Sequence, residues 1–542
     1  MKRRDLLSCS AASLWFLSGC TSTDSTPNEN EPSNRPASTE PTNSDGTSDR
    51  DSDEDEASDT DSTNAPTNDS TDDAHDFEED GVEPDQGHID AIGATERHDV
   101  SFDRTVHVVD HFGVEPYGGD PINKIIKRLP DRTLLKFPRG RFRIDPGLHL
   151  EEISTIGFLG SEDGTTLYVP RRAKNRIIEI LDAESVTFEN FVIDQNRPDT
   201  VGSFRFWVSD RLHIENIVFE GRGLRMDGVE PSAFDLRILE PDGLGIVKGW
   251  VDQTGSGWAS YNDSQGRIGA LVRGARHQGT IKFIECDLRE FGNNALYASR
   301  CVGNVQVEDC YFENNNVASV RIGGEGSYVE GSTIVVSEDR YTGPRIHEDS
   351  SFFMRGIVIE ENHSDHGQKA AGAEIRNCEL LIEDNPTAAP AIMGWSNGRS
   401  VKIEDTTIEY HNDGEGVIVR EDYSSKSSHP PGDPPRWLRL ENVEISGTGT
   451  VPVAVSVEDA DGTAIRNSSI HMEGEEVDGV LIVNSEESLI EETTIIVRGK
   501  PTTFIDSSVE TEALTVGRPD PTPDEDDARS PLGDGPPQNE ST

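Results

Sequence analysis

Three arginines in the sequence are spaced so that they could bind an anionic ligand together. Arg273, Arg300 and Arg321 lie in the similar short segments GALVRG, LYASRC and ASVRIGG. If the intervals of 27 and 21 residues between them are each about one turn of a repeat, the side chains project from one face. A guanidinium binds carboxylate or sulfate through two parallel hydrogen bonds. The row, with Tyr297 beside Arg300, could therefore hold an acidic polysaccharide. The alternative is that each arginine pairs with acidic side chains around it.

Histidines near these segments are candidate acids or bases, because imidazole titrates near neutral pH. We name His277 and His366, together with Arg300, as catalytic candidates. His366 lies in ENHSDHG, within an interval long enough to fold over the arginine face as a lid. The alternative is that these are solvated loop residues. The string HSDH could also hold a metal, but we assign no metal ligand.

Calcium is the one cofactor that we consider. It needs several oxygen ligands, and acidic residues surround the arginine segments. Acidic residues occur throughout the chain, so their presence here assigns no site. The candidates are Glu285, Asp287, Glu290, Glu308, Asp309 and Glu313.

The elements that would position these residues are short strands. One window recurs eleven times: apolar, any, apolar, two of any kind, small or apolar, any, apolar. Its period-two alternation predicts strands, and the break inside it predicts a turn between two strands. The third positions of the window are Phe188, Ile214, Ile246, Phe283, Val307, Val329, Ile375, Ile403, Leu440, Ile465 and Ile490.

The shortest intervals between windows are 22 to 26 residues, a period typical of repeat architectures. No helical period intervenes, so the windows predict a parallel solenoid of short stacked strands. The sixth position is small from Gly249 onward, as an inward turn requires. Cys286 and Cys310 occupy it on neighbouring coils, within reach of a disulfide. We favour free buried thiols, because cysteine packs well as a small hydrophobe.

The composition excludes one class of partner. The chain has 542 residues and a formal net charge of −53, whereas a nucleic-acid binder carries a basic surface. Such an acidic chain resembles proteins of extreme halophiles, in which salt screens self-repulsion. The alternative is an acidic tail beside an ordinary domain, but acidic residues also run through the body.

Both ends of the chain differ from the body. Residues 1–20 resemble a twin-arginine lipoprotein signal, with RRDLL followed by a lipobox, LSGC, that ends at Cys20. Residues 21–88 are Ser, Thr, Asp, Glu, Asn and Pro with almost no aliphatics, which predicts a disordered stalk. Residues 517–542 predict a similar acidic tail. The body between them is 89–516.

The start of the body resembles the N-terminal cap of the pectin-lyase-like (pectate lyase) superfamily. The residues that carry this resemblance are Asp110, Phe112, Gly113, Gly119, Asp120, Phe137, Pro138, Gly140 and Phe142. The pairs Asn293–Asn294 and Asn315–Asn316 similarly resemble the asparagine ladder of pectate-lyase-like β-helices. With its charge and signal, the chain is similar to haloarchaeal exported lipoproteins of this type.

The resemblance implies an all-β fold, a single-stranded right-handed parallel β-helix of about 11–13 coils. The segment PINKIIKRL would form a short N-terminal capping helix. Lyases of the superfamily use an arginine base, and pectate lyases use calcium to neutralise the uronate. The chain lacks the strings N-T-D, G-H-G and R-I-K of polygalacturonases and D-P-H-E of alginate epimerases. The resemblance therefore implies a substrate class and no particular reaction.

We expect an exported, lipid-anchored protein that acts on or binds acidic polysaccharide, by lyase or hydrolase chemistry if it is an enzyme. The alternative is a non-catalytic surface protein that binds a cell-surface glycan as an adhesin does. We expect a monomer at the outer face of the membrane, which it touches only through its lipid.

Overall fold

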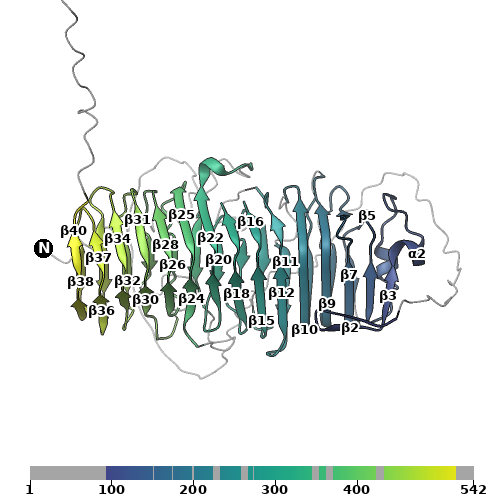
Figure 1. Cartoon of the computed structure of the whole chain (residues 1–542), viewed down its shortest axis with the longest axis horizontal. Coiled ribbons are helices and arrows are strands. Elements are labelled where there is room, and N and C mark those ends of the chain that lie inside the picture. The colour runs from purple at the N-terminus through teal and green to yellow at the C-terminus, as the bar shows by residue number, and fades with distance from the viewer. Residues whose placement is uncertain are drawn as a thin grey trace, which may run out of the picture. The chain divides into compact units, whose positions relative to one another are not determined.

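The body of the protein is a parallel β-helix. A computed structural model describes residues 93–519, apart from 151, 174, 198–199, 224–231, 258–265, 273, 345–352, 362–369 and 423–431. Nearly every strand pairs in parallel with the equivalent strand of the next coil. The strands stack along the long axis of the body, from α2 near one end to β40 at the other (Figure 1). The predicted fold is thus confirmed.

Each coil contributes to three parallel sheets, which we call A, B and C. The strands of sheet A are β3 (Arg104–His107), β4 (Thr133–Lys136), β7 (Thr155–Leu159), the middle parts of β9 (Ile178–Asp194) and β10 (Phe204–Glu220), β12 (Leu244–Lys248), β15 (Thr280–Ile284), β18 (Asn304–Glu308), β21 (Tyr328–Glu330), β24 (Ala373–Arg376), β27 (Val401–Glu404), β30 (Leu438–Glu441), β33 (Ala464–Arg466), β36 (Ser488–Glu491) and β39 (Val509–Glu512).

Sheet B follows sheet A in each coil after a short turn. Its strands are β5 (Gly140–Arg143), β8 (Thr165–Tyr168), the last parts of β9 and β10, β13 (Val251–Asp252), β16 (Asp287–Arg289), β19 (Tyr311–Glu313), β22 (Thr333–Ser337), β25 (Glu379–Asp384), β28 (Thr407–Tyr410), β31 (Glu444–Gly447), β34 (Ser469–Met472), β37 (Thr494–Ile496) and β40 (Thr515–Gly517). A 3-10 turn (Glu338–Arg340) follows β22.

Sheet C leads into the sheet A strand of each coil. Its strands are β6 (Leu148–Leu150), the first parts of β9 and β10, β11 (Ser232–Ile238), β14 (Ile268–Leu271), β17 (Leu296–Tyr297), β20 (Ala318–Ile322), β23 (Arg355–Ile359), β26 (Ile392–Gly394), β29 (Ile418–Arg420), β32 (Val453–Glu458), β35 (Asp478–Val483) and β38 (Thr502–Ile505).

The repeated window places apolar side chains above one another in the core. Phe283 pairs with Val307, and Val307 with Val329, and all three are fully buried. The prediction is wrong by one residue at Ile246, because Val247 pairs with Phe283 and points inward instead.

The turn from sheet A to sheet B explains why the alternation breaks inside the repeated window. It also explains why the window at Ile246 was placed one residue too early. Two residues after each inward third position, the backbone adopts a positive φ, which favours Asn, Asp and Gly. Gly249 holds this place two residues after Val247, which fixes the register of that coil. The column comprises Asn190, Asn216, Gly249, Glu285, Asp309, Gly331, Asn377, Asp405, Asn442, Asn467 and Glu492.

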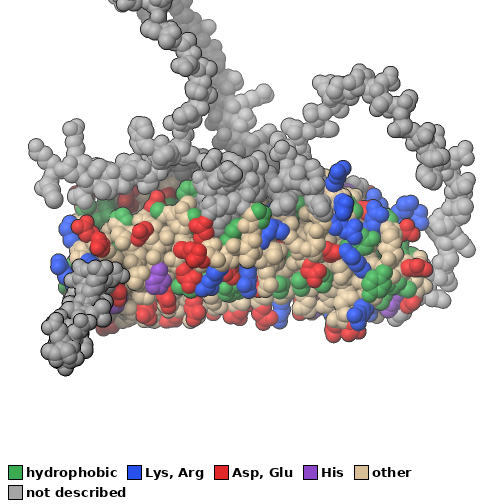
Figure 2. All heavy atoms as spheres, turned by 90° about the horizontal axis from the view of Figure 1, so that it is seen from above, with side chains coloured by type: hydrophobic (Ala, Val, Ile, Leu, Met, Phe, Trp, Pro, Cys, Tyr) green, Lys and Arg blue, Asp and Glu red, His purple; other side chains and the backbone are tan. Residues whose placement is uncertain are grey.

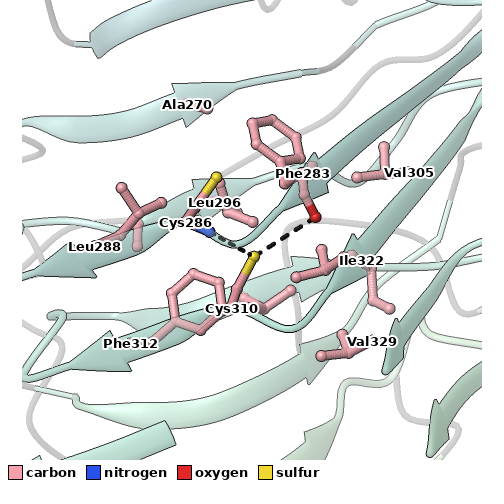
Figure 3. Packing of buried hydrophobic residues seen from close by; sticks show 14 of the residues in the cluster. Ala270, Phe283, Cys286, Leu288, Leu296, Val305, Cys310, Phe312, Ile322 and Val329 are labelled. Atoms are coloured by element: carbon pink, nitrogen blue, oxygen red, sulfur yellow. Dashed lines mark hydrogen bonds between the residues drawn. The ribbon is translucent and has the colours of Figure 1, made fainter. Parts of the chain in front are cut away.

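The sixth position of the window links successive coils inside the core. The backbone N–H of Cys286 donates to Sγ of Cys310 over 3.4 Å, and the N–H of Cys310 donates to Oγ of Ser332 over 3.1 Å. Figure 3 shows the two cysteines beside Phe283 and Phe312. Both thiols are free, and burial raises the pKa of Cys310.

The four asparagines predicted to form a ladder make other hydrogen bonds. Asn294 Nδ2 donates to Oδ1 of its neighbour Asn293 over 2.7 Å, and the other pair bonds to the backbone. Asn315 Nδ2 donates to the carbonyl of Leu288 over 3.0 Å, and Asn316 Nδ2 donates to that of Gly292 over 3.2 Å. An amide-to-amide bond between coils instead joins Asn216 to Asn190 over 3.0 Å, at the turn from sheet A to sheet B.

Helical turns close the N-terminal end of the β-helix. Helix α2 (Val108–Phe112) buries Val108 in the core. The predicted capping segment contains a shorter helix, α3 (Asn123–Ile126), and Ile122 and Ile126 join the same core. Among the described residues, no helix combines the length and the apolar character needed to cross a bilayer.

An antiparallel hairpin lies outside the coils. Its strands are β1 (Thr95–Arg97) and β2 (Val100–Phe102). Val100 and Phe102 form a small apolar cluster with Leu134, a sheet A residue that lies outside the main core. The sequence pattern gave no indication of this hairpin.

Candidate functional site

Two of the predicted arginines converge on one buried carboxylate. Arg300 Nε donates to Oε1 of Glu360 over 2.9 Å, and Arg321 Nε donates to Oε2 over 2.7 Å. Glu360 follows β23 directly and is fully buried. We call Glu360 with Ser299, Arg300, Arg321 and Asn397 the Glu360 cluster.

The arginines do not occupy equivalent positions on successive coils, as we had expected. Tyr297 is the residue that pairs with Arg321, and Arg300 lies three residues beyond Tyr297. One coil is 24 residues long here, from Leu296 to Val320. Arg300 and Arg321 are only 21 residues apart, three too few for equivalent positions on successive coils. Arg300 reaches Glu360 because it sits beyond the end of β17, with a positive φ of 54°.

Charges and hydrogen bonds decide the ionisation of Glu360. Burial alone would raise the pKa of its carboxyl, but the charges of Arg321 and Arg300 hold that pKa well below its usual range. Ser299 Oγ donates to Oε2, and Asn397 Nδ2 donates to Oε1 over 3.1 Å. Glu360 is therefore a fixed anion that orients two guanidinium groups, and it is unsuited to donate a proton.

Aromatic rings enclose one of these guanidinium groups. The Cζ atom of Arg321 lies 4.2 Å from the ring centroid of Tyr297 and 4.3 Å from that of Trp395. Both aromatic side chains are partly exposed. Trp395 also packs against an apolar cluster formed by Ala318, Val358 and Met393 on the outer side of sheet C.

A second carboxyl group near Trp395 has the opposite character. Burial raises the pKa of Glu421, and its Oε2 accepts the N–H of Ser396 over 2.9 Å. Buried arginines hold the surrounding backbone. Arg420 donates to the carbonyls of Trp395 and Gly398, and Arg436 donates to that of Ser396. The arrangement offers one fixed carboxylate and one carboxyl that retains its proton more readily.

The other predicted residues lie elsewhere. His277 is fully buried. Its Nδ1 accepts the N–H of Ile238 over 3.1 Å, and its Nε2 lies 3.4 Å from the carbonyl of Asn304. Arg273 and His366 lie outside the described residues, as does Cys20.

The acidic residues considered for calcium are mostly paired with basic side chains. Arg289 contacts Asp287 and Glu313, the latter over 3.0 Å. Lys282 contacts Glu308 over 3.0 Å, and Arg222 contacts Glu290. Calcium binding near the arginines stays a prediction.

The residue that organises the site, Glu360, was not among the residues predicted from the sequence. Glu360 sits in RGIVIEEN, where an acidic pair ends a strongly apolar strand, a signal that could have marked it. A group of histidines and carboxylates at the N-terminal coils was not predicted either. His98, Glu189, His213 and Glu215 offer ligand atoms that all lie within 4.8 Å of one another.

No protein-family model and no curated protein sequence matches the chain. The adhesin PfbA of Streptococcus pneumoniae matches in structure with a TM-score of 0.37 and 10% identity, over 76% of this chain and 93% of that one. A tailspike protein of an E. coli bacteriophage matches with a TM-score of 0.35 and 10% identity, over 74% and 76%. An alpha-1,3-glucanase from Streptomyces thermodiastaticus matches with a TM-score of 0.32 and 13% identity, over 78% and 70%. Such distant matches assign no ligand or reaction. By its own strand register, the chain is a parallel β-helix protein.

Proposed function

We propose that the protein binds an acidic polysaccharide through the surface formed by Tyr297, Trp395 and the partly exposed Arg300, beneath which the buried Arg321 holds the two rings in place. The observation that carries this proposal is the fixed position of two guanidinium groups on Glu360, with two partly exposed rings against one of them. The side chain of Arg300 is 18% exposed, so its positive charge can attract the carboxylate of an acidic sugar. Rings held in place lose little entropy when a sugar stacks on them.

The same geometry favours binding over proton abstraction by arginine. A base must turn a lone pair toward its substrate, whereas a guanidinium that donates to a carboxylate keeps those N–H groups directed at the carboxylate. Arg300 and Arg321 both contact a carboxylate that stays ionised. The function is therefore anion recognition, with Arg300 as a ligand-binding residue.

Hydrolysis is the second candidate function, and Glu421 is the observation that favours it. A glycosidase needs a carboxyl that donates a proton and a second carboxylate. The raised pKa of Glu421 suits the first role. Glu361, which lies 3.7 Å from Arg399 and is 3% exposed, is the candidate for the second, because its charge and that of Glu421 both act on Arg420.

Affinity electrophoresis in gels that contain polygalacturonate or alginate tests the binding proposal. We expect acidic polysaccharides to retard the full chain and a neutral glucan to leave it unaffected. Trp395→Ala should weaken binding by about tenfold, because an aromatic contact at the centre of an interface contributes more than about 1 kcal/mol. The matched control is Trp437→Ala, which removes a ring that stacks on Arg439 at 4.1 Å on a later coil.

Equal retardation of the two tryptophan variants would refute the proposed surface. The same samples, assayed for unsaturated uronate and for new reducing ends, test the enzymatic alternatives. Hydrolysis would be established if the wild-type chain produced new reducing ends and the Glu421→Gln variant did not. Unsaturated products that disappear in Arg300→Lys would establish the lyase mechanism instead.

The location of the protein is part of the proposal. We infer that the chain is exported by the twin-arginine route and anchored by a lipid on Cys20, since LSGC ends an apolar stretch behind RRDLL. The stalk of residues 21–88 would hold a monomeric β-helix away from the membrane. Its partner would be a surface or environmental glycan rather than nucleic acid.

A further inference from the structure

We infer that His98, Glu189, His213 and Glu215 form a binding site for one divalent transition-metal ion of the zinc type. This site lies at the N-terminal coils, apart from the Glu360 cluster, and does not depend on the proposed function. Its role would be to fasten the hairpin of β1 and β2 to sheet A. We call the four residues the hairpin site.

The ligand atoms of the hairpin site are already gathered. His98 Nε2 lies 3.0 Å from Glu189 Oε2 and 3.8 Å from Glu215 Oε2, and His213 Nε2 lies 2.9 Å from Glu215 Oε2. Zinc ligands at about 2.0–2.1 Å in a tetrahedron lie about 3.3–3.4 Å apart. The observed separations bracket that value, so small side-chain shifts would admit an ion.

The ligand types select the class of metal. Two imidazoles with two carboxylates suit zinc and its neighbours, whereas calcium and magnesium prefer sites built from oxygen alone. The rings of His98 and His213 lie parallel, with centroids 3.4 Å apart and planes inclined by 10°. Two imidazoles stacked beside two carboxylates form a compact group that a single cation would hold together.

Separate elements bring the four ligands to one place. Glu189 lies on β9, while His213 and Glu215 lie two residues apart on β10, so both point to the outer side of sheet A. His98 comes from the hairpin turn, where it has a positive φ of 52°. The hairpin covers this part of the sheet. This explains why His213 is only 8% exposed, although Arg211 and Glu215 on the same side of the strand are partly exposed.

Packing fixes the hairpin above the sheet. Phe102 enters a gap left by Gly157, since a Cβ there would lie 2.8 Å from the Phe102 ring and 2.7 Å from Leu134. The hairpin turn is thereby held near His213 before any ion binds. Preorganised ligands lose less entropy on binding, which favours affinity.

Neighbouring charges are compatible with a cation. Arg97 donates to Glu189 from Nε over 2.7 Å and also from Nη2. A carboxylate has about four lone-pair positions, so Glu189 can contact Arg97 and an ion together. Such outer partners orient ligands in known metal sites. Among the described residues, the charge of Lys248 also acts on Glu215, and that of Glu162 acts on Arg97.

Metal uptake by the full chain tests the inference. After treatment with EDTA, the chain should bind one Zn²⁺ in calorimetry, and Co²⁺ should give the visible absorption of a four-coordinate site. His213→Gln should weaken Zn²⁺ binding by at least about 100-fold, since even outer partners of metal ligands contribute 10- to 100-fold. The matched control is His149→Gln, because His149 contacts Glu179 over 3.0 Å in a His–Glu pair without the second pair of ligands.

A second measurement separates a metal site from adventitious binding. Zn²⁺ should slow hydrogen exchange of the amides in β1 and β2 in the wild-type chain and in His149→Gln, but not in His213→Gln. The inference is overturned if the wild-type chain takes up no Zn²⁺, or if His213→Gln and His98→Gln bind it as tightly as the control. Ca²⁺ that protects the hairpin as well as Zn²⁺ does would also overturn it.

Discussion

Glu360 shows how one buried residue can set the character of a surface. It accepts hydrogen bonds from Arg300, Arg321, Ser299 and Asn397, which belong to three different coils. Without it, the guanidinium groups of Arg300 and Arg321 would lose the counter-ion that they share. The carboxylate is therefore a positioning residue for Arg300, the proposed ligand-binding arginine, and for the buried Arg321.

Removal of this charge should destabilise the protein strongly. Glu360→Gln should lower the free energy of unfolding by about 3–5 kcal/mol, because it leaves the buried Arg321 and the partly buried Arg300 without their shared counter-ion. The control is Glu383→Gln, whose partner Arg340 is 2.9 Å away in an exposed pair, and which should cost at most about 1 kcal/mol. Urea denaturation at pH 7 measures both, and equal losses would contradict the structure.

The contribution of Glu360 should also depend on pH. Because its folded pKa lies below the ordinary value of 4.5, its stabilisation is present above pH 4.5 and declines as the pH falls further. The stability difference between wild type and Glu360→Gln should thus be constant from pH 7 to about pH 5. Below pH 4.5, this difference in the free energy of unfolding should become smaller. A gap that widens on acidification would show that the folded pKa is raised instead.

At the scale of elements, two kinds of contact hold the coils in place. The strands stack in register through the inward columns, while the hairpin of β1 and β2 binds across the outside of sheet A. The hairpin depends on the missing side chain at Gly157, since Phe102 and Leu134 fill that space. This contact links a segment before the first coil to the third strand of sheet A.

A methyl group at Gly157 should therefore displace the hairpin. Gly157→Ala should cost about 1–3 kcal/mol, the usual penalty for overpacking, and should speed hydrogen exchange in β1 and β2. The control is Gly119→Ala, because a Cβ at Gly119 would meet no atom within 4 Å. If both variants exchange alike, the hairpin does not pack where the structure places it.

At the scale of the whole molecule, the dominant property is negative charge. The chain carries a formal charge of −53. Figure 2 shows acidic side chains along much of one face of the body, with Lys and Arg most evident toward the N-terminal coils. Self-repulsion of this size opposes the compact state, and we propose that the protein works in concentrated salt.

Salt should accordingly stabilise the protein. Raising KCl from about 0.1 M to about 1 M shortens the Debye length from about 10 Å to about 3 Å. The Tm should rise by at least about 3 °C, the shift that roughly 1 kcal/mol produces in a larger domain. Thermal denaturation followed by circular dichroism measures this. A Tm that stays level or falls would refute the proposed adaptation to salt.

The sequence by itself determined the repeat, because an inward column tolerates only apolar or small residues at a fixed period. The pattern therefore predicted correctly that Phe283, Val307 and Val329 lie above one another on successive coils. The error at Ile246 arose because the alternation fits either of two adjacent residues, and only Gly249 at the turn fixes the register.

Only the tertiary structure decided which polar residues meet. Glu360 lies 60 residues from Arg300 and 39 from Arg321, and the coil between Val320 and Ile357 is lengthened by an insertion. His98 is separated from His213 by several coils, yet the hairpin brings their rings together. Insertions and external strands change the spacing without changing the core pattern, so sequence intervals cannot predict contacts outside the columns. Such contacts depend on how each inserted or external segment packs against the three sheets.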